Sequence, residues 1–123
     1  MLNALKIRPN GIVEAYQIDP KDMLKSVQEG VGGYVQSAGV LRKKQKGEKG
    51  WLTVYVNEDG MSMNLPFNCY AVVGDHSVPL YGDLIVCRAT SFCKVCDMTP
   101  ADIESIYITD TAIRQFILRT RAR

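Results

Sequence analysis

The sequence predicts an α+β fold: one domain, built on a largely antiparallel β-sheet with two or three short helices. Three observations lead to this prediction. Runs rich in β-branched and aromatic residues dominate the chain. Turn-forming pairs such as Asn-Gly and Asp-Gly separate these runs. Helix caps followed by apolar residues at helical spacing occur only over short stretches. A length of 123 residues suits a single hydrophobic core.

The individual elements follow from these patterns. The predicted strands are residues 4–8, 12–18, 34–41, 51–56, 61–65, 83–88 and 92–96. The predicted helical segments are 20–28, 69–73, one that starts at Thr99-Pro100, and the amphipathic stretch 111–119. The turn at Pro9-Asn10-Gly11 should be of type I′, because Asn and Gly both tolerate positive φ. Asp19 is the expected cap of the first helix, and Asn68 that of the second.

The charge is unevenly distributed, although the net charge is only +2. One basic segment lies near the middle of the chain and another at its end, while the rest of the sequence is acidic. The residues expected to contact phosphate or nucleic acid are Arg42, Lys43, Lys44, Lys46, Arg119 and Arg121. The alternative is a solvated loop and tail, since charge runs are usually surface.

Four cysteines occur without a secretion signal, which favours free thiols in a reducing cytosol. Cys93 and Cys96 have the spacing of a zinc ligand pair. Their segment alternates like a strand, however, which would direct the two thiols to opposite faces. Ordinary buried cysteines are therefore favoured over a zinc site or a redox pair, and no metal or cofactor is predicted.

An ordered series of short motifs runs through the first three quarters of the chain. The motifs are Pro9-Asn10-Gly11, Val31-Gly32-Gly33-Tyr34-Val35, Val56-Asn57-Glu58-Asp59-Gly60, Leu65-Pro66-Phe67-Asn68 with Ala71, and Gly82-Asp83. This series resembles the domain-of-unknown-function family 3846, small proteins of phages, plasmids and other mobile elements. The resemblance covers residues 4–90. Residues 91–123 lie outside it and are expected to form a C-terminal helical extension with a basic tail. The chain departs from the family at one position: the family usually has a carboxylate near the position of Gln36, and this chain lacks it.

The polar residues of the series suggest a ligand pocket where two loops meet at one end of the sheet. Carboxylates and amides there would read the edge of a polar ring, and Tyr34, Tyr55 and Trp51 would form its apolar walls. Backbone N–H groups in the glycine pair would approach a phosphate. The expected ligand-binding residues are Gly32, Gly33, Tyr34, Asn57, Glu58, Asn68 and Asp83. The alternative is that these residues serve turns and helix caps.

No catalytic motif of known mechanics is present. His76 is the only histidine, and Asp75-His76-Ser77 cannot form a triad because adjacent residues do not converge on one another. The leading hypothesis is thus a non-catalytic binding module. The resemblance to the family implies that it resides in a bacterial cytoplasm and belongs to a mobile element. It would interfere with a host defence process by binding a host protein or sequestering a nucleotide-like signal.

Two alternatives come from other classes of protein. One is a basic protein associated with nucleic acid. The other is a small hydrolase or transferase that uses Glu58 and Asp83 as paired carboxylates. No membrane association is expected, since no apolar run is long enough. Pairing with a second copy through Ile113, Phe116, Ile117 and Leu118 is as consistent with the sequence as packing of these residues on their own sheet.

Overall fold

The computed structural model describes residues 1–40, 49–73, 76–103 and 115–118. Its larger sheet has the strand order β2-β1-β7-β4-β3, with β8 paired to β7, and every pairing is antiparallel. These strands are β1 (Leu2–Ile7), β2 (Val13–Ile18), β3 (Val35–Val40), β4 (Trp51–Asn57), β7 (Leu84–Ala89) and β8 (Val95–Cys96). The α+β class and the antiparallel character that the sequence predicts are confirmed.

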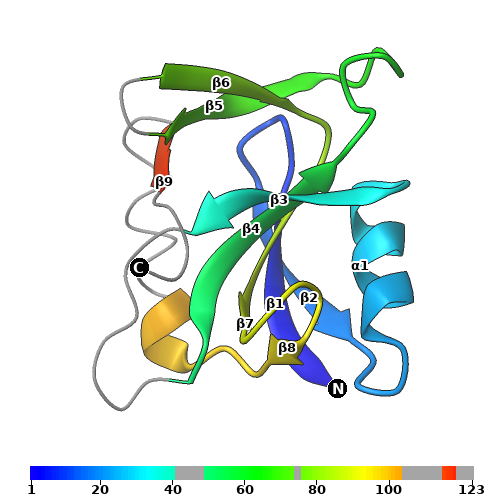
Figure 1. Ribbon diagram of the computed structural model, residues 1–123, viewed down its shortest axis with the longest axis vertical. Coiled ribbons are helices and arrows are strands. Elements are labelled where there is room, and N and C mark those ends of the chain that lie inside the picture. The colour runs from blue at the N-terminus through cyan, green and yellow to red at the C-terminus, as the bar shows by residue number, and fades with distance from the viewer. Residues whose placement is uncertain (41–48, 74–75, 104–114, 119–123) are drawn as a thin grey trace.

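A smaller sheet has the order β6-β5-β9, with strands β5 (Phe67–Val73), β6 (His76–Tyr81) and β9 (Gln115–Leu118). β5 and β6 form an antiparallel hairpin, and β9 runs parallel to β5. Figure 1 shows this sheet above the larger one, with α1 (Met23–Val31) at the right-hand margin. Residues 100–103 form a second short helical segment.

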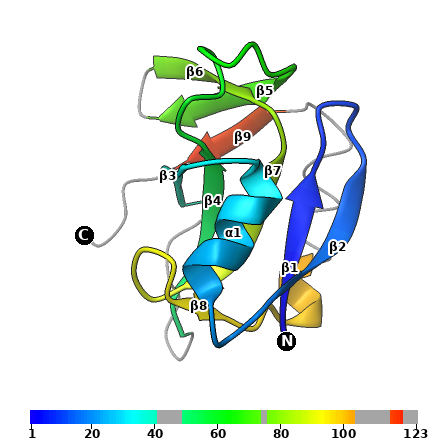
Figure 2. The same cartoon turned by 90° about the vertical axis from the view of Figure 1, so that its right-hand side faces the viewer.

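The central strands are covered on both faces. Figure 2 shows α1 crossing in front of the larger sheet, where Val27 and Val31 pack with Tyr55 and Ile85. The other face packs with the smaller sheet; its core includes Leu5, Val54, Val86, Ala71 and Leu80. Burial on both sides explains why all six residues of β7 are buried and why its first four are apolar rather than alternating.

Two predicted elements in the second half of the chain are wrong. Residues 61–65 form turns rather than a strand, and Asn64 takes a left-handed conformation with φ of 56°. Residues 69–73 belong to strand β5 rather than a helix. Cys69 and Ala71 point inward and Tyr70 outward, so this segment alternates with the two-residue period of a strand.

The C-terminal segment also differs from its prediction. The sequence predicts a helix over 111–119, but residues 115–118 form β9, whose backbone pairs with that of β5. The rest of that stretch, including Ile113, lies outside the described residues. A short apolar run cannot by periodicity alone be assigned to a helix or to a buried strand, and here the pairing with β5 decides.

The first turn and helix are displaced in detail from their predictions. Gly11 alone in the first hairpin turn has positive φ (86°), and its N–H donates to the carbonyl of Arg8, so the turn is not of type I′. Asp22 rather than Asp19 caps α1, accepting from the N–H of Lys25. The helix continues past the predicted end, to Val31.

The last strand of the larger sheet is shorter than the sequence predicts. The helix predicted to start at Thr99-Pro100 is confirmed. Of the strand predicted at 92–96, only Val95 and Cys96 pair with β7, because Cys93 takes a left-handed φ of 55°. Thr99 and Asp102 exchange hydrogen bonds between side chain and backbone N–H, with distances of 3.0 and 3.1 Å. This reciprocal pair caps the helical segment at 100–103.

Candidate ligand-binding site

Asn57, at the end of β4, joins the sheet to the C-terminal end of α1. Its side chain is only 4% exposed. Nδ2 donates to the carbonyl of Val31 at 3.2 Å, and Oδ1 accepts the N–H of Asp59 at 2.8 Å. The amide that the sequence assigned to a ligand is therefore used to hold the helix against the strand.

The glycine pair ends the helix. Gly32 has a φ of 79°, and the N–H groups of Gly32 and Gly33 both donate to the carbonyl of Gln28, at 2.8 and 3.1 Å. These N–H groups are consequently not directed at a phosphate, as the sequence had predicted. The end of a helix that they close carries the negative pole of the helix dipole, which also disfavours an anion.

Asn68 has a structural role as well. It is 2% exposed, and Nδ2 donates to the carbonyls of Ile7 and Gly82 at 2.9 and 2.8 Å. The side chain thus ties β1 to the turn before β7, and it does not cap a helix. Glu58 is exposed, and its N–H donates to the carbonyl of Tyr34 at 2.8 Å.

The predicted pocket is therefore only partly formed. Trp51, Tyr55 and Glu58 line none of the four main cavities formed by the described residues. Gly32 and Asp83, by contrast, line one cavity of about 350 Å³, which we call the α1 groove. Its lining residues are Lys6, Pro9, Glu29, Gly30, Val31, Gly32, Leu65, Pro66, Gly82 and Asp83. Gly33 and Tyr34 line an adjoining cavity that shares Gly32 and Glu29 with the groove.

The α1 groove contains a lysine that the sequence analysis did not identify. The side chain of Lys6 is 14% exposed, and its Nζ lies 3.9 Å from Oδ2 of Asp83 and 5.1 Å from the ring centre of Tyr16. The first distance is too long for a hydrogen bond. Within the described part of the chain the ammonium group donates no hydrogen bond, an unusual state for a group so little exposed.

A signal for Lys6 was present in the sequence. It interrupts the apolar run Ala4-Leu5-Lys6-Ile7, and the period of a strand places it on the same face as Ala4. That face packs against α1, as the burial of Ala4 in the helix-side core shows. A lysine on the covered face of a strand is a candidate for function, because burial of an ammonium group is costly unless a partner compensates.

Asp83 connects the groove to a charged network on β1 and β2. Its Oδ2 accepts from Nη1 of Arg8 at 3.4 Å, and Arg8 also pairs with Glu14 at 2.6 Å. The hydrogen bond and charge of Glu14 raise the pKa of Arg8, with a further contribution from Asp83. Burial, and then the charge of Glu29, raises the pKa of Tyr16. The other charged residues that line the groove with Lys6 are the carboxylates Glu29 and Asp83.

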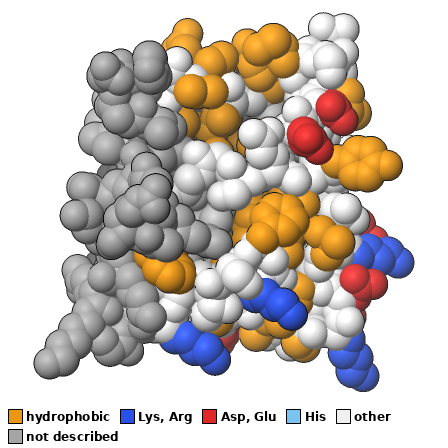
Figure 3. Space-filling view, in the orientation of Figure 1, with side chains coloured by type: hydrophobic (Ala, Val, Ile, Leu, Met, Phe, Trp, Pro, Cys, Tyr) orange, Lys and Arg blue, Asp and Glu red, His pale blue; other side chains and the backbone are white. Residues whose placement is uncertain are grey.

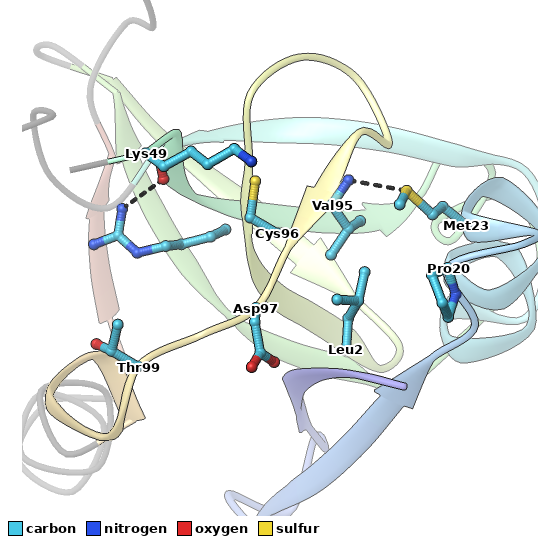
Figure 4. Close-up of a pocket in the computed structure, with 9 residues that line it drawn as sticks. Leu2, Pro20, Met23, Lys49, Val95, Cys96, Asp97 and Thr99 are labelled. Carbon is cyan, nitrogen blue, oxygen red and sulfur yellow. Dashed lines mark hydrogen bonds between the residues drawn. The ribbon is translucent and has the colours of Figure 1, made fainter.

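A second, larger cavity of about 590 Å³ lies at the other end of α1, and we call it the basal cavity. Figure 4 shows its residues: apolar side chains that include Leu2, Met23 and Val95, together with Lys49 and Cys96. Met23 is held in place, since its sulfur accepts the N–H of Val95 at 3.2 Å.

Arg88 and Asp102 form a buried ion pair behind the basal cavity. Nε and Nη2 of Arg88 contact the two carboxylate oxygens of Asp102 at 2.6 and 2.9 Å. Burial alone would raise the pKa of Asp102, but the hydrogen bonds and charge of Arg88, with the N–H of Thr99, lower it to about 2. Nη1 of Arg88 also donates to the carbonyls of Lys49 and Gly50, the two residues before β4.

The cysteines are free thiols. Three are buried and Cys96 is half-buried. Among the residues that the structure describes, no group of three or more His, Cys, Asp or Glu side chains could hold a metal ion. The basic residues expected to contact phosphate, Arg42 to Lys46 and Arg119 to Arg121, lie outside the described ranges.

The fold and site together define a small α+β protein with a sheet covered on both faces and a charged groove at the end of its helix. The chain belongs to the family described as Domain of unknown function (DUF3846), whose model matches residues 2–112. The match confirms the resemblance found in the sequence and extends it past residue 90. No curated protein and no solved structure matches the chain.

The motifs that carry the family resemblance meet around the α1 groove. Gly32, Leu65-Pro66 and Gly82-Asp83 line it, while the hydrogen bonds of Asn57 and Asn68 hold the segments that form it.

Figure 3 shows charged side chains of both signs interspersed with hydrophobic ones on one face of the protein. None of the helices in the described ranges could span a membrane.

Proposed function

We propose that this protein is a non-catalytic binding module that sequesters a small, nucleotide-like ligand in the α1 groove. The observation that carries the proposal is Lys6: an ammonium group 14% exposed, in a cavity, with no hydrogen bond from the described residues. A largely covered polar group in this state gains most from a ligand that supplies the missing acceptor.

The surroundings of the groove favour binding over catalysis. The hydrolase alternative requires Glu58 and Asp83 to act as a pair. Asp83 instead faces the cations Lys6 and Arg8, and Glu58 lies outside the groove. The lining includes no histidine, cysteine, serine or threonine that would serve as base or nucleophile.

The setting we propose is the cytoplasm of a bacterial host, with the gene carried by a phage, plasmid or other mobile element. A binding module without chemistry would act there by removing a signal that a host defence process requires. A host protein is the other partner that this role allows, and it would leave the groove without a small ligand.

Association with nucleic acid is a second candidate function, which one observation favours. Lys49 stands at the rim of the basal cavity, directly after a segment that contains Arg42, Lys43, Lys44 and Lys46. Contacts of this kind are to phosphates, so the affinity for DNA or RNA would fall steeply as the salt concentration rises. Binding in the α1 groove would change little with salt.

Native mass spectrometry of the protein purified from its bacterial host tests the proposal. We expect a retained adduct of nucleotide size on the wild-type protein and its loss from Lys6→Met. Lys21→Met, an exposed position outside the groove, is the matched control and should keep the adduct. A wild-type protein that carries no small molecule, but co-purifies with a host protein, would contradict the proposed ligand.

A further inference from the structure

The α1 groove places a hydrogen-bond donor and an acceptor next to each other. The ammonium group of Lys6 only donates, and the carboxylate of Asp83 only accepts. Nζ and Oδ2 lie 3.9 Å apart, so the two groups attract each other without sharing a hydrogen bond. Two adjacent atoms on the edge of a ligand can therefore contact both groups at once.

Both groups keep unused capacity. The two contacts of Asp83 with Lys6 and Arg8 go to Oδ2, and no residue in the described ranges hydrogen-bonds to Oδ1. Lys6 retains its donors, since its ammonium group donates no hydrogen bond to the described residues. The ligand that fits this pair has an acceptor beside one or two donors on the same edge.

The rest of the groove limits the shape and charge of that ligand. Pro9, Leu65 and Pro66 supply apolar surface, which suits the faces of a flat ring. Glu29 lines the groove, and the C-terminal end of α1 adds the negative pole of its dipole. A phosphate inside the groove would be repelled, so the ring rather than the phosphate must be the recognised part.

We propose that the α1 groove recognises a purine of the guanine type, an inference that rests on the proposed function. Guanine has the O6 acceptor next to the N1–H and N2–H donors. Lys6 donates to O6, and the carboxylate of Asp83 accepts from N1–H and N2–H. Sugar and phosphate point away from the negative end of α1, towards solvent.

Other bases do not fit this pair. Adenine has an amino group where guanine has O6, so two donors would face each other at Lys6, and its N1 acceptor would face the carboxylate. Hypoxanthine keeps O6 and N1–H but lacks the amino group. Discrimination should therefore follow the order guanine, hypoxanthine, adenine.

Isothermal titration calorimetry of the full chain with guanosine, inosine, adenosine and guanosine monophosphate tests the inference. Guanosine should bind about tenfold to hundredfold more tightly than adenosine, the range that one two-point base contact gives. Inosine should fall between them. Guanosine monophosphate should bind no more tightly than guanosine, because Lys6 is engaged by O6 and the phosphate points away from the groove, towards solvent.

Asp83→Asn tests the role of the carboxylate by reversing the preference. An amide donates as well as accepts, so this variant should favour xanthosine, whose O2 is an acceptor where guanosine has its amino group. Glu14→Gln is the matched control: it removes the partner of Arg8 outside the groove and should leave the preference unchanged. Retained discrimination against adenosine in Asp83→Asn, with no gain for xanthosine, would overturn the assignment.

The outcomes separate this inference from the proposed function. Equal binding of all purine nucleosides, abolished in Lys6→Met, would overturn the guanine assignment but keep the groove as the ligand site. No binding of any nucleoside, with a folded protein, would overturn the guanine inference. If the protein isolated from its host also carried no small ligand, the proposed function would fail with it.

Discussion

Gly33 and Asn57 are in direct contact: a Cβ on Gly33 would lie 2.8 Å from Nδ2 of Asn57, within the distance that real Cβ atoms avoid. This contact lets the amide of Asn57 reach the carbonyl of Val31 and close the end of α1 onto β4. The wall of the α1 groove therefore depends on the absence of a Cβ at Gly33 and on the buried amide of Asn57.

Gly33→Ala should destabilise the protein by about 1 to 3 kcal/mol, since the methyl group forces the Asn57 amide from its place. Gly32→Ala is the comparison: its Cβ meets nothing within 4 Å, and only the positive φ is strained, at a cost of about 1 kcal/mol. Urea denaturation of both variants measures the difference. Equal losses would show that the contact with Asn57 costs nothing.

Asn68→Ala should reduce the free energy of unfolding by about 2 to 4 kcal/mol. The substitution leaves the carbonyls of Ile7 and Gly82 without their donor in a buried place. Glu58→Gln changes an exposed residue of the same motif series and should alter stability by less than about 0.5 kcal/mol. If Asn68→Ala unfolds at the same urea concentration as the wild type, the amide does not hold β1 to the turn.

The ion pair of Arg88 and Asp102 predicts a defined acid sensitivity. The pKa of Asp102 is lowered to about 2 from an ordinary 3.8, so the pair stabilises the fold above about pH 4. That stabilisation, about 2 kcal/mol, is lost as the pH falls through the folded-state pKa.

Thermal unfolding between about pH 5 and pH 2 measures this effect, with Asp102→Asn as the comparison. The wild-type protein should lose its advantage over the variant as the pH falls. A constant difference in unfolding temperature across this range would contradict the lowered pKa.

Cys96 should be the most reactive thiol of the native protein. It is half-buried and lines the basal cavity, whereas Cys69, Cys87 and Cys93 are buried. Burial also raises the pKa of Cys93, although the hydrogen bond with Tyr55 opposes this, and so keeps that thiol protonated. Brief treatment with a maleimide, followed by peptide mass mapping, should label Cys96 first. Equal labelling of all four thiols would contradict this order.

The sequence predicts the sheet strands β1, β2, β3, β4 and β7 because each has a clear apolar pattern between turn residues. It fails at residues 69–73 and 115–118, where short apolar segments become strands only through pairing across the chain. Local spacing cannot show such pairing. The same limit applies to Asn68, whose position after Pro66 suggests a cap, while its partners lie at Ile7 and Gly82.

The sequence predicts only part of the candidate site, because contacts between distant segments also decide which side chains are available there. The expectation that loops meet at one end of the sheet led to Gly32 and Asp83, which do line one cavity. Which polar side chains remain free there depends on hydrogen bonds between distant segments, and these use up Asn57 and Asn68. Lys6 was overlooked because a lysine within a strand ordinarily points to solvent, and only the packing of α1 shows that this one does not.

The claim that the α1 groove binds the ligand is tested most directly by amide NMR spectra recorded during titration with guanosine. The account predicts shifts concentrated at Lys6, Gly30 to Gly33 and Gly82-Asp83, and their disappearance in Lys6→Met. Shifts that instead centre on Lys49, Cys96 and Asp97 would place the ligand in the basal cavity and contradict the account.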